Sequence, residues 1–213
     1  MAINATSESN GGNYTPVPSG THVARCYQMI EIGTITEPYL GEMKTSKKVR
    51  IGWELPLETK EFKQGEGERP FVISKDFTLS MHEKATLRKF LEAWRGKTFT
   101  EAEAKSFDIT KLIGVPCMVS VIHEEKEGKN HAKVTGVTSI PKGMTCPEQV
   151  NETFVLSYDA FDLEKFNTLP KFIKEKMEKS VEFKKISDVL HSNEYTKKVL
   201  TESSDKSFDD LPF

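Results

Sequence analysis

The chain has 213 residues, of which 37% are hydrophobic and 29% charged, so we expect one globular domain of ordinary size with polar extensions. Its formal net charge of −2 excludes a strongly basic protein that would attract nucleic acid through its overall field. The sequence has no apolar run of bilayer length and no secretory signal, so we expect a cytoplasmic protein with no membrane partner. Its three cysteines, at positions 26, 117 and 146, are widely spaced, which predicts that they are reduced.

Residues 1–19 are rich in Asn, Ser, Gly and Pro and predict a flexible N-terminal arm. Three β segments follow, at about 22–35, 47–57 and 70–79, and Gly33 indicates a bend or bulge in the first. The second alternates clearly, with Val49, Ile51 and Trp53 on one face and Lys48 and Arg50 on the other. A polar loop is expected over residues 37–46.

A helix is predicted after the third strand. Ser80 and Glu83 have the spacing of a capping box, and Gly96 suits the position just after the helix. Between them, four apolar residues share one helical face: Leu87, Phe90, Leu91 and Trp94. A second short helix is expected from Thr100, and residues 115–123 and 129–140 predict a β-hairpin.

Three strands, a helix and a hairpin are the element order of an OB-fold, a five-stranded barrel with a helix between strands three and four. We therefore predict a mainly β protein with an OB-fold at residues 20–140, and an SH3-like or sandwich fold is the alternative. Residues 141–190 predict a partly helical extension, with a helix near Pro170, that docks on the barrel or on a second subunit. A homo-oligomer is therefore possible. Residues 191–213 read as a disordered acidic tail.

The sequence offers no catalytic set, metal site or cofactor motif, so we expect a protein that is not an enzyme. Gly96-Lys97-Thr98 matches the end of a phosphate-binding loop, but Leu91 stands where that motif needs glycine, and the triplet follows a helix. The cysteines lack metal-ligand spacing, and Cys26 and Cys117 lie in apolar segments typical of a core.

The distribution of charge is uneven along the chain. Residues 21–140 hold 19 Lys and Arg against 17 Asp and Glu, whereas residues 201–213 hold one Lys against four acids. Single-stranded DNA is held by cations along its phosphates and by aromatic rings on its bases. The candidate binding residues from the first three strands and their loops are Arg25, Tyr27, Lys44, Lys47, Lys48, Arg50, Trp53, Lys75 and Phe77. For Trp53, core packing is at least as good an interpretation as stacking, because it shares a face with Val49 and Ile51.

The last residues combine two carboxylates with an apolar ending that a partner pocket can hold: Asp209, Asp210, Leu211, Pro212 and Phe213. This segment resembles the acidic tip of bacterial single-stranded DNA-binding proteins, with Leu211 in place of isoleucine. The body resembles phage-encoded single-stranded DNA-binding proteins through residues 48–55, 77–80, 87–91 and 94–100.

The resemblance implies an OB-fold protein of phage DNA replication or recombination in a bacterial host cell. It would protect single-stranded DNA without sequence preference and recruit replication or recombination enzymes through its tip. An alternative function is an interaction protein that mimics the host tip to occupy host replication and repair enzymes, with the barrel as its scaffold.

Overall fold

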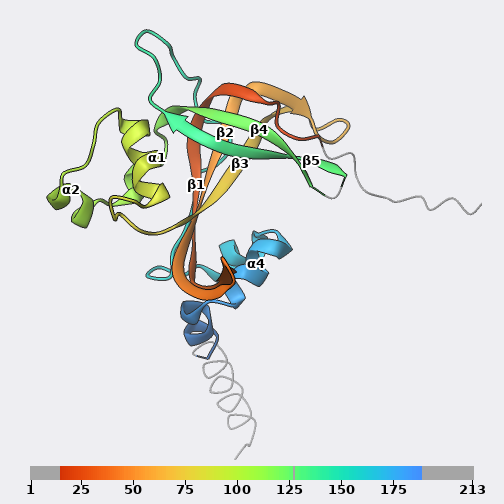
Figure 1. The fold of residues 1–213 in the computed structure, drawn as a ribbon. Coiled ribbons are helices and arrows are strands. Elements are labelled where there is room, and N and C mark those ends of the chain that lie inside the picture. Colours follow the sequence, from red (N-terminus) through yellow and green to blue (C-terminus); the bar gives the residue numbers. More distant parts are fainter. Residues whose placement is uncertain (1–14, 127, 189–213) are drawn as a thin grey trace, which may run out of the picture.

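The computed structural model describes residues 15–126 and 128–188, which form a mainly β structure with few helices (Figure 1). Five antiparallel strands are arranged in the order β3-β2-β1-β4-β5. Their bounds are β1 Gly20–Tyr39, β2 Glu42–Glu61, β3 Glu68–Thr78, β4 Pro116–Lys126 and β5 Lys129–Thr138. A sixth short strand, β6 (Phe154–Leu156), pairs parallel with β1. Within the described residues no strand pairing joins β3 to β5, so the sheet is open.

Strand β1 is the centre of the sheet and changes partners along its length. Its beginning, up to Arg25, pairs with β4, and residues 28–30 pair with β6 on the same edge. The register against β2 shifts after Cys26 and again between Glu31 and Gly33. The predicted irregularity at Gly33 is confirmed, and its φ of +94° is a conformation that L side chains rarely adopt.

The loop predicted over residues 37–46 is wrong: this segment is a β-hairpin. Tyr39 pairs with Glu42, so only Leu40 and Gly41 form the turn, with φ values of 51° and 86°. Two positive φ values are what a type I′ turn requires, and this turn matches the twist of the two strands. The sequence did not indicate it because leucine is an unusual residue for the first of these positions.

Helix α1 (Thr86–Arg95) ends at Gly96 as predicted, with a left-handed φ of 68° at that glycine. Its start differs from the prediction, because the residue before it is Ala85 and no side chain caps it. Ser80 instead accepts a hydrogen bond from the amide of His82, which forms a local turn. A capping box occurs at α2 (Glu101–Ser106), between Thr100 and Glu103. A short 3₁₀ helix, η1 (Ile109–Leu112), leads into β4.

The main hydrophobic core lies between the sheet and α1, which Figure 1 shows beside the strands together with α2. Leu87, Leu91 and Trp94 of α1 are buried there, as their spacing predicted. Trp94 lies against Trp53 of β2, with 6.0 Å between the ring centroids. Cys26 and Cys117 are also buried in this core, which agrees with their apolar surroundings in the sequence.

A second core covers the distal half of β1. It joins Ile30, Ile32 and Ile35 to β6, α3 (Leu163–Thr168) and α4 (Lys171–Glu178), and residues 181–188 continue as helix. The extension therefore packs on the sheet of its own chain, at the lower end of the strands in Figure 1. Glu182 fixes it by accepting hydrogen bonds from the amide and the hydroxyl of Thr34, at 2.6 and 2.7 Å. None of the helices in the described residues is long and apolar enough to cross a membrane.

Candidate nucleic-acid interface

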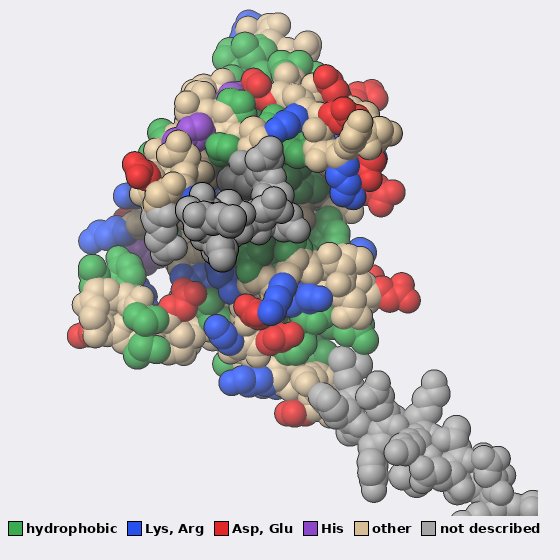
Figure 2. Space-filling view, turned by 90° about the vertical axis from the view of Figure 1, so that its right-hand side faces the viewer, with side chains coloured by type: hydrophobic (Ala, Val, Ile, Leu, Met, Phe, Trp, Pro, Cys, Tyr) green, Lys and Arg blue, Asp and Glu red, His purple; other side chains and the backbone are tan. Residues whose placement is uncertain are grey.

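A cleft of about 610 Å³ lies at the distal end of the sheet. One wall is the β1–β2 hairpin, the floor is the end of β3, and the other wall is the loop from β3 to α1. Figure 2 shows the molecule hollowed at its lower left, with Lys and Arg side chains along the inner side. The residues that line the cleft are Glu37, Pro38, Tyr39, Lys44, Ser46, Lys48, Lys75, Asp76, Phe77, Thr78, Ser80, His82, Lys84, Ala85 and Thr86.

The charge available inside this cleft is positive, because its two carboxylates are already neutralised. Glu37 lies 3.4 Å from the ammonium of Lys48. Asp76 accepts from Arg50 at 2.5 Å and from Lys176 of α4 at 2.6 Å. Three further lysines line the cleft and make no ion pair within residues 15–126 and 128–188: Lys44, Lys75 and Lys84. The ammonium groups of Lys44 and Lys84 are exposed and available to an anionic ligand, whereas that of Lys75 already donates to the carbonyl of Val134.

The contacts of Lys75 explain the presence of a lysine in an otherwise apolar row of β3. Its Nζ donates a hydrogen bond of 2.9 Å to the carbonyl of Val134 on β5, so the side chain bridges the two end strands of the open sheet. The ammonium also lies 5.4 Å from the ring centroid of Phe90 and 5.9 Å from that of Phe77. Burial lowers the pKa of Lys75, and the nearby charge of Lys133 acts in the same direction.

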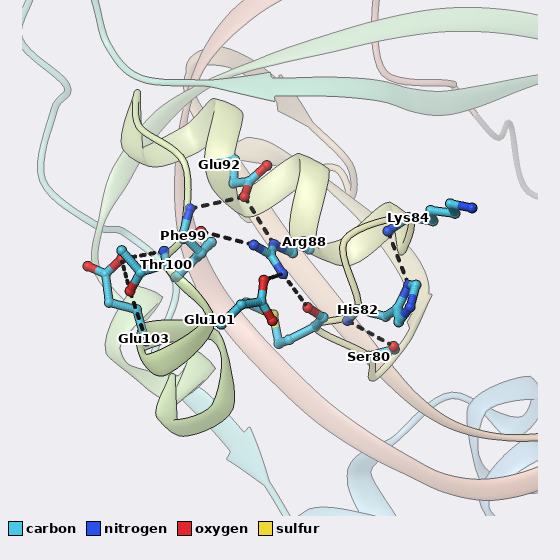
Figure 3. Close-up of polar contacts among 10 residues, drawn as sticks. Ser80, His82, Lys84, Arg88, Glu92, Phe99, Thr100, Glu101 and Glu103 are labelled. Atoms are coloured by element: carbon cyan, nitrogen blue, oxygen red, sulfur yellow. Dashed lines mark hydrogen bonds and ion pairs between the residues drawn. The ribbon is translucent and has the colours of Figure 1, made fainter.

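The loop from β3 to α1 is held in place by Arg88, which is only 6% exposed (Figure 3). Its guanidinium donates to the carbonyl of Met81 in the loop at 3.2 Å and to that of Phe99 at 2.9 Å. It also donates to the carboxylates of Glu92 and Glu101. This network fixes the wall of the cleft from behind. The side chains of His82 and Lys84 point away from the Arg88 network, as Figure 3 shows.

Four of the nine predicted DNA-binding residues meet in the cleft: Lys44, Lys48, Lys75 and Phe77. Phe77 exposes only 3% of its surface and packs edge-on against Phe90, with 5.0 Å between centroids. Its ring is part of the core and offers no face to a base. Arg50 lies just beyond the cleft, where it pairs with Asp76 and lies 5.3 Å from the ring centroid of Phe172.

The other four predicted residues lie outside the cleft. Lys47 pairs with Glu31 at 2.5 Å, and this hydrogen bond raises the pKa of the lysine. Arg25 donates to the carbonyls of Gly114, Cys146 and Pro147 and so joins β1 to two crossing segments.

The two remaining predicted residues are aromatic. Trp53 is 1% exposed, which supports the core interpretation of that residue. Tyr27 is half-buried, and burial, followed by the charge of Glu54, raises its pKa.

Of the cleft residues that were not predicted, three have an aromatic or basic side chain: Tyr39, His82 and Lys84. Tyr39 is 59% exposed, and the ammonium of Lys44 lies 5.0 Å from its ring centroid. The signal for Tyr39 was an aromatic residue in a polar, lysine-containing segment, but the loop interpretation hid the pairing of the two strands. His82 accepts a hydrogen bond at Nδ1 from the amide of Lys84.

No protein-family model matches the chain, and no curated protein is similar to it at a significant level. In the part of the chain that the structure describes, no group of three or more His, Cys, Asp or Glu side chains could hold a metal ion. The predicted tip, from Asp209 to Phe213, lies outside the described residues.

Proposed function

We propose that the protein binds single-stranded DNA without sequence preference and acts in DNA replication or recombination. The observation that carries this proposal is the cleft between the β1–β2 hairpin and the loop after β3, where Lys44 and Lys84 are exposed and without carboxylate partners in the described residues. Unpaired lysines bind phosphates, and an exposed ring such as that of Tyr39 can stack on a base.

The fold supports the same proposal. A helix follows β3, and Lys75 joins the two end strands through Val134, so we propose that the sheet is a partly open OB barrel. OB-folds bind oligonucleotides on the face of strands 2 and 3 and with the loop between strands 1 and 2. The cleft lies at this loop and at the end of this face.

The mixed surface charge sets the expected strength of binding. Figure 2 shows Lys and Arg interspersed with Asp and Glu on the face that it displays, so attraction to DNA must come from the local cluster. Each phosphate contact adds about 0.7 to the slope of log affinity against log salt for a single strand. Loss of two lysines should therefore reduce this slope by about 1.4.

Fluorescence anisotropy with a labelled oligothymidine and with a duplex, each at several salt concentrations, tests the proposal. We expect binding to the single strand and weaker binding to the duplex, with a lower affinity and a shallower salt slope in the double variant Lys44→Ala and Lys84→Ala. The matched control is Lys63→Ala, since Lys63 is exposed, pairs with Glu66 and lies outside the cleft. Absence of binding at low salt would refute the proposal and favour the interaction protein that occupies host enzymes.

We further propose that the segment from Asp209 to Phe213 recruits replication or recombination enzymes. Its two carboxylates suit a basic pocket, and its apolar residues suit a hydrophobic one. Deletion of residues 208–213 should abolish capture of such enzymes and slightly tighten DNA binding at low salt, because acidic groups that compete with phosphates are removed. Weaker DNA binding after the deletion would show that the segment does not compete with DNA.

A further inference from the structure

The tip of the β1–β2 hairpin presents three large apolar side chains to solvent. Tyr39 is 59% exposed, Leu40 88% and Met43 66%. Single exposed apolar residues are common on proteins, but three at one turn form a small apolar surface. This surface is continuous with the cleft, because Tyr39 lines its wall.

The backbone at Leu40 makes this residue hard to explain by folding alone. Its φ of 51° lies in the left-handed region, and it is the one non-glycine residue with positive φ among the described residues. Asn and Gly occupy this position of a two-residue hairpin turn far more readily than leucine. Leu40 therefore combines a strained backbone with a side chain that has nothing to pack against, which points to a contact outside the protein.

The charges around the tip select the chemistry of that contact. The ammonium of Lys44 lies 5.0 Å from the centroid of the Tyr39 ring, and Lys44 lines the cleft together with Lys48, which pairs with Glu37. Nucleobases joined by phosphates have the matching pattern of flat apolar faces with a negative charge at each step. Leu57, an exposed leucine at the other end of β2, is followed by Glu58 and not by a lysine.

We infer that the hairpin tip is a wedge that separates two adjacent bases of the bound single strand. Leu40 enters the step between the bases, Tyr39 stacks on one of them, and Lys44 contacts the phosphate between them. Proteins that separate base steps use apolar side chains of this size for insertion. The inference rests on the proposed function and adds to it the element that unstacks the strand.

Leu40→Asn tests the wedge while favouring the fold, because asparagine suits the left-handed conformation. The probe is an oligodeoxyadenosine that carries one 2-aminopurine, whose fluorescence rises when its neighbours no longer stack on it. Wild-type protein should raise this fluorescence and Leu40→Asn should not. The variant should also bind about tenfold or more weakly, since burial of a leucine side chain between two bases contributes about 1.5–3 kcal/mol. Leu40→Gly should behave in the same way, and Leu57→Asn, a change at a similarly exposed leucine (62%), should behave like wild type.

The thermal midpoint of Leu40→Asn should equal or exceed that of wild type, which separates a lost contact from a damaged fold. If wild type and Leu40→Asn bind equally and raise the fluorescence equally, the wedge is refuted and the tip is left to a protein partner, while the proposed function stands. If wild type binds no oligonucleotide, the proposed function and the wedge both fail.

Discussion

Replacing Gly33 by alanine should lower the free energy of unfolding by more than the cost of the unfavourable backbone conformation alone. At φ +94°, any L residue costs about 1–2 kcal/mol. The added Cβ would also lie 2.7 Å from Cβ of Ser180 and 2.8 Å from a ring carbon of Tyr158, so both side chains must move. The hydroxyl of Tyr158 would then lose its bonds to the carbonyl of Ile32 and to Ser180, now 3.1 and 2.8 Å long.

Two lost hydrogen bonds contribute about 1 kcal/mol each, so we expect the free energy of unfolding to fall by about 3–4 kcal/mol in Gly33→Ala. Urea unfolding followed by circular dichroism measures this difference. The control is Gly143→Ala, because Gly143 has a similar φ of +89° and nothing within 4 Å of an added Cβ. The control should lose only about 1–2 kcal/mol. Equal losses in the two variants would refute the argument that close packing of the extension on β1 requires glycine.

Two further predictions concern titratable groups. The Thr100 amide and then the Arg95 guanidinium lower the pKa of Glu103 to about 2 from an ordinary 4.5. A carboxyl with a depressed folded-state pKa stabilises the protein above its unfolded pKa and loses this effect as pH falls through the folded one. The thermal midpoint of wild type should therefore drop more than that of Glu103→Gln between pH 4.5 and 2, and parallel curves would contradict the assignment. Burial raises the pKa of Cys26 to about 12, so this thiol should react slowly at pH 8. Mass spectrometry after iodoacetamide treatment at pH 8 should therefore show labelling of the partly exposed Cys146 first. Earlier labelling of Cys26 would contradict its burial.

The sequence predicted the strands well where one face is buried. In β2, Val49, Ile51 and Trp53 occupy alternate positions, and all three lie in the core. The same alternation could not separate a core aromatic residue from a DNA-binding one, because both occupy the apolar face of a strand. Trp53 and Phe77 were therefore included as candidate stacking residues, although the structure buries them.

The site was harder to predict than the strands because it depends on pairing between distant segments. Lys44 lies in β2 and Lys84 in the loop before α1, and only the fold brings them to one cleft. Arg25 was a candidate phosphate-binding residue in the sequence, but its guanidinium donates hydrogen bonds to the carbonyls of Gly114, Cys146 and Pro147 instead. Strand β6 has three residues, too few for a periodic pattern, so its parallel pairing with β1 could not be expected from the sequence.

The change of partners along β1 also bears on aggregation. An unpaired strand edge can template the addition of another chain. The edge of β1 opposite β2 is covered first by β4 and then by β6. Further along, the carboxylate of Glu182 accepts a hydrogen bond from the amide of Thr34. The extension thus protects an edge that the five-stranded sheet alone would leave open. A protein truncated before residue 154 should therefore be prone to self-association through β1, even if its main core still folds.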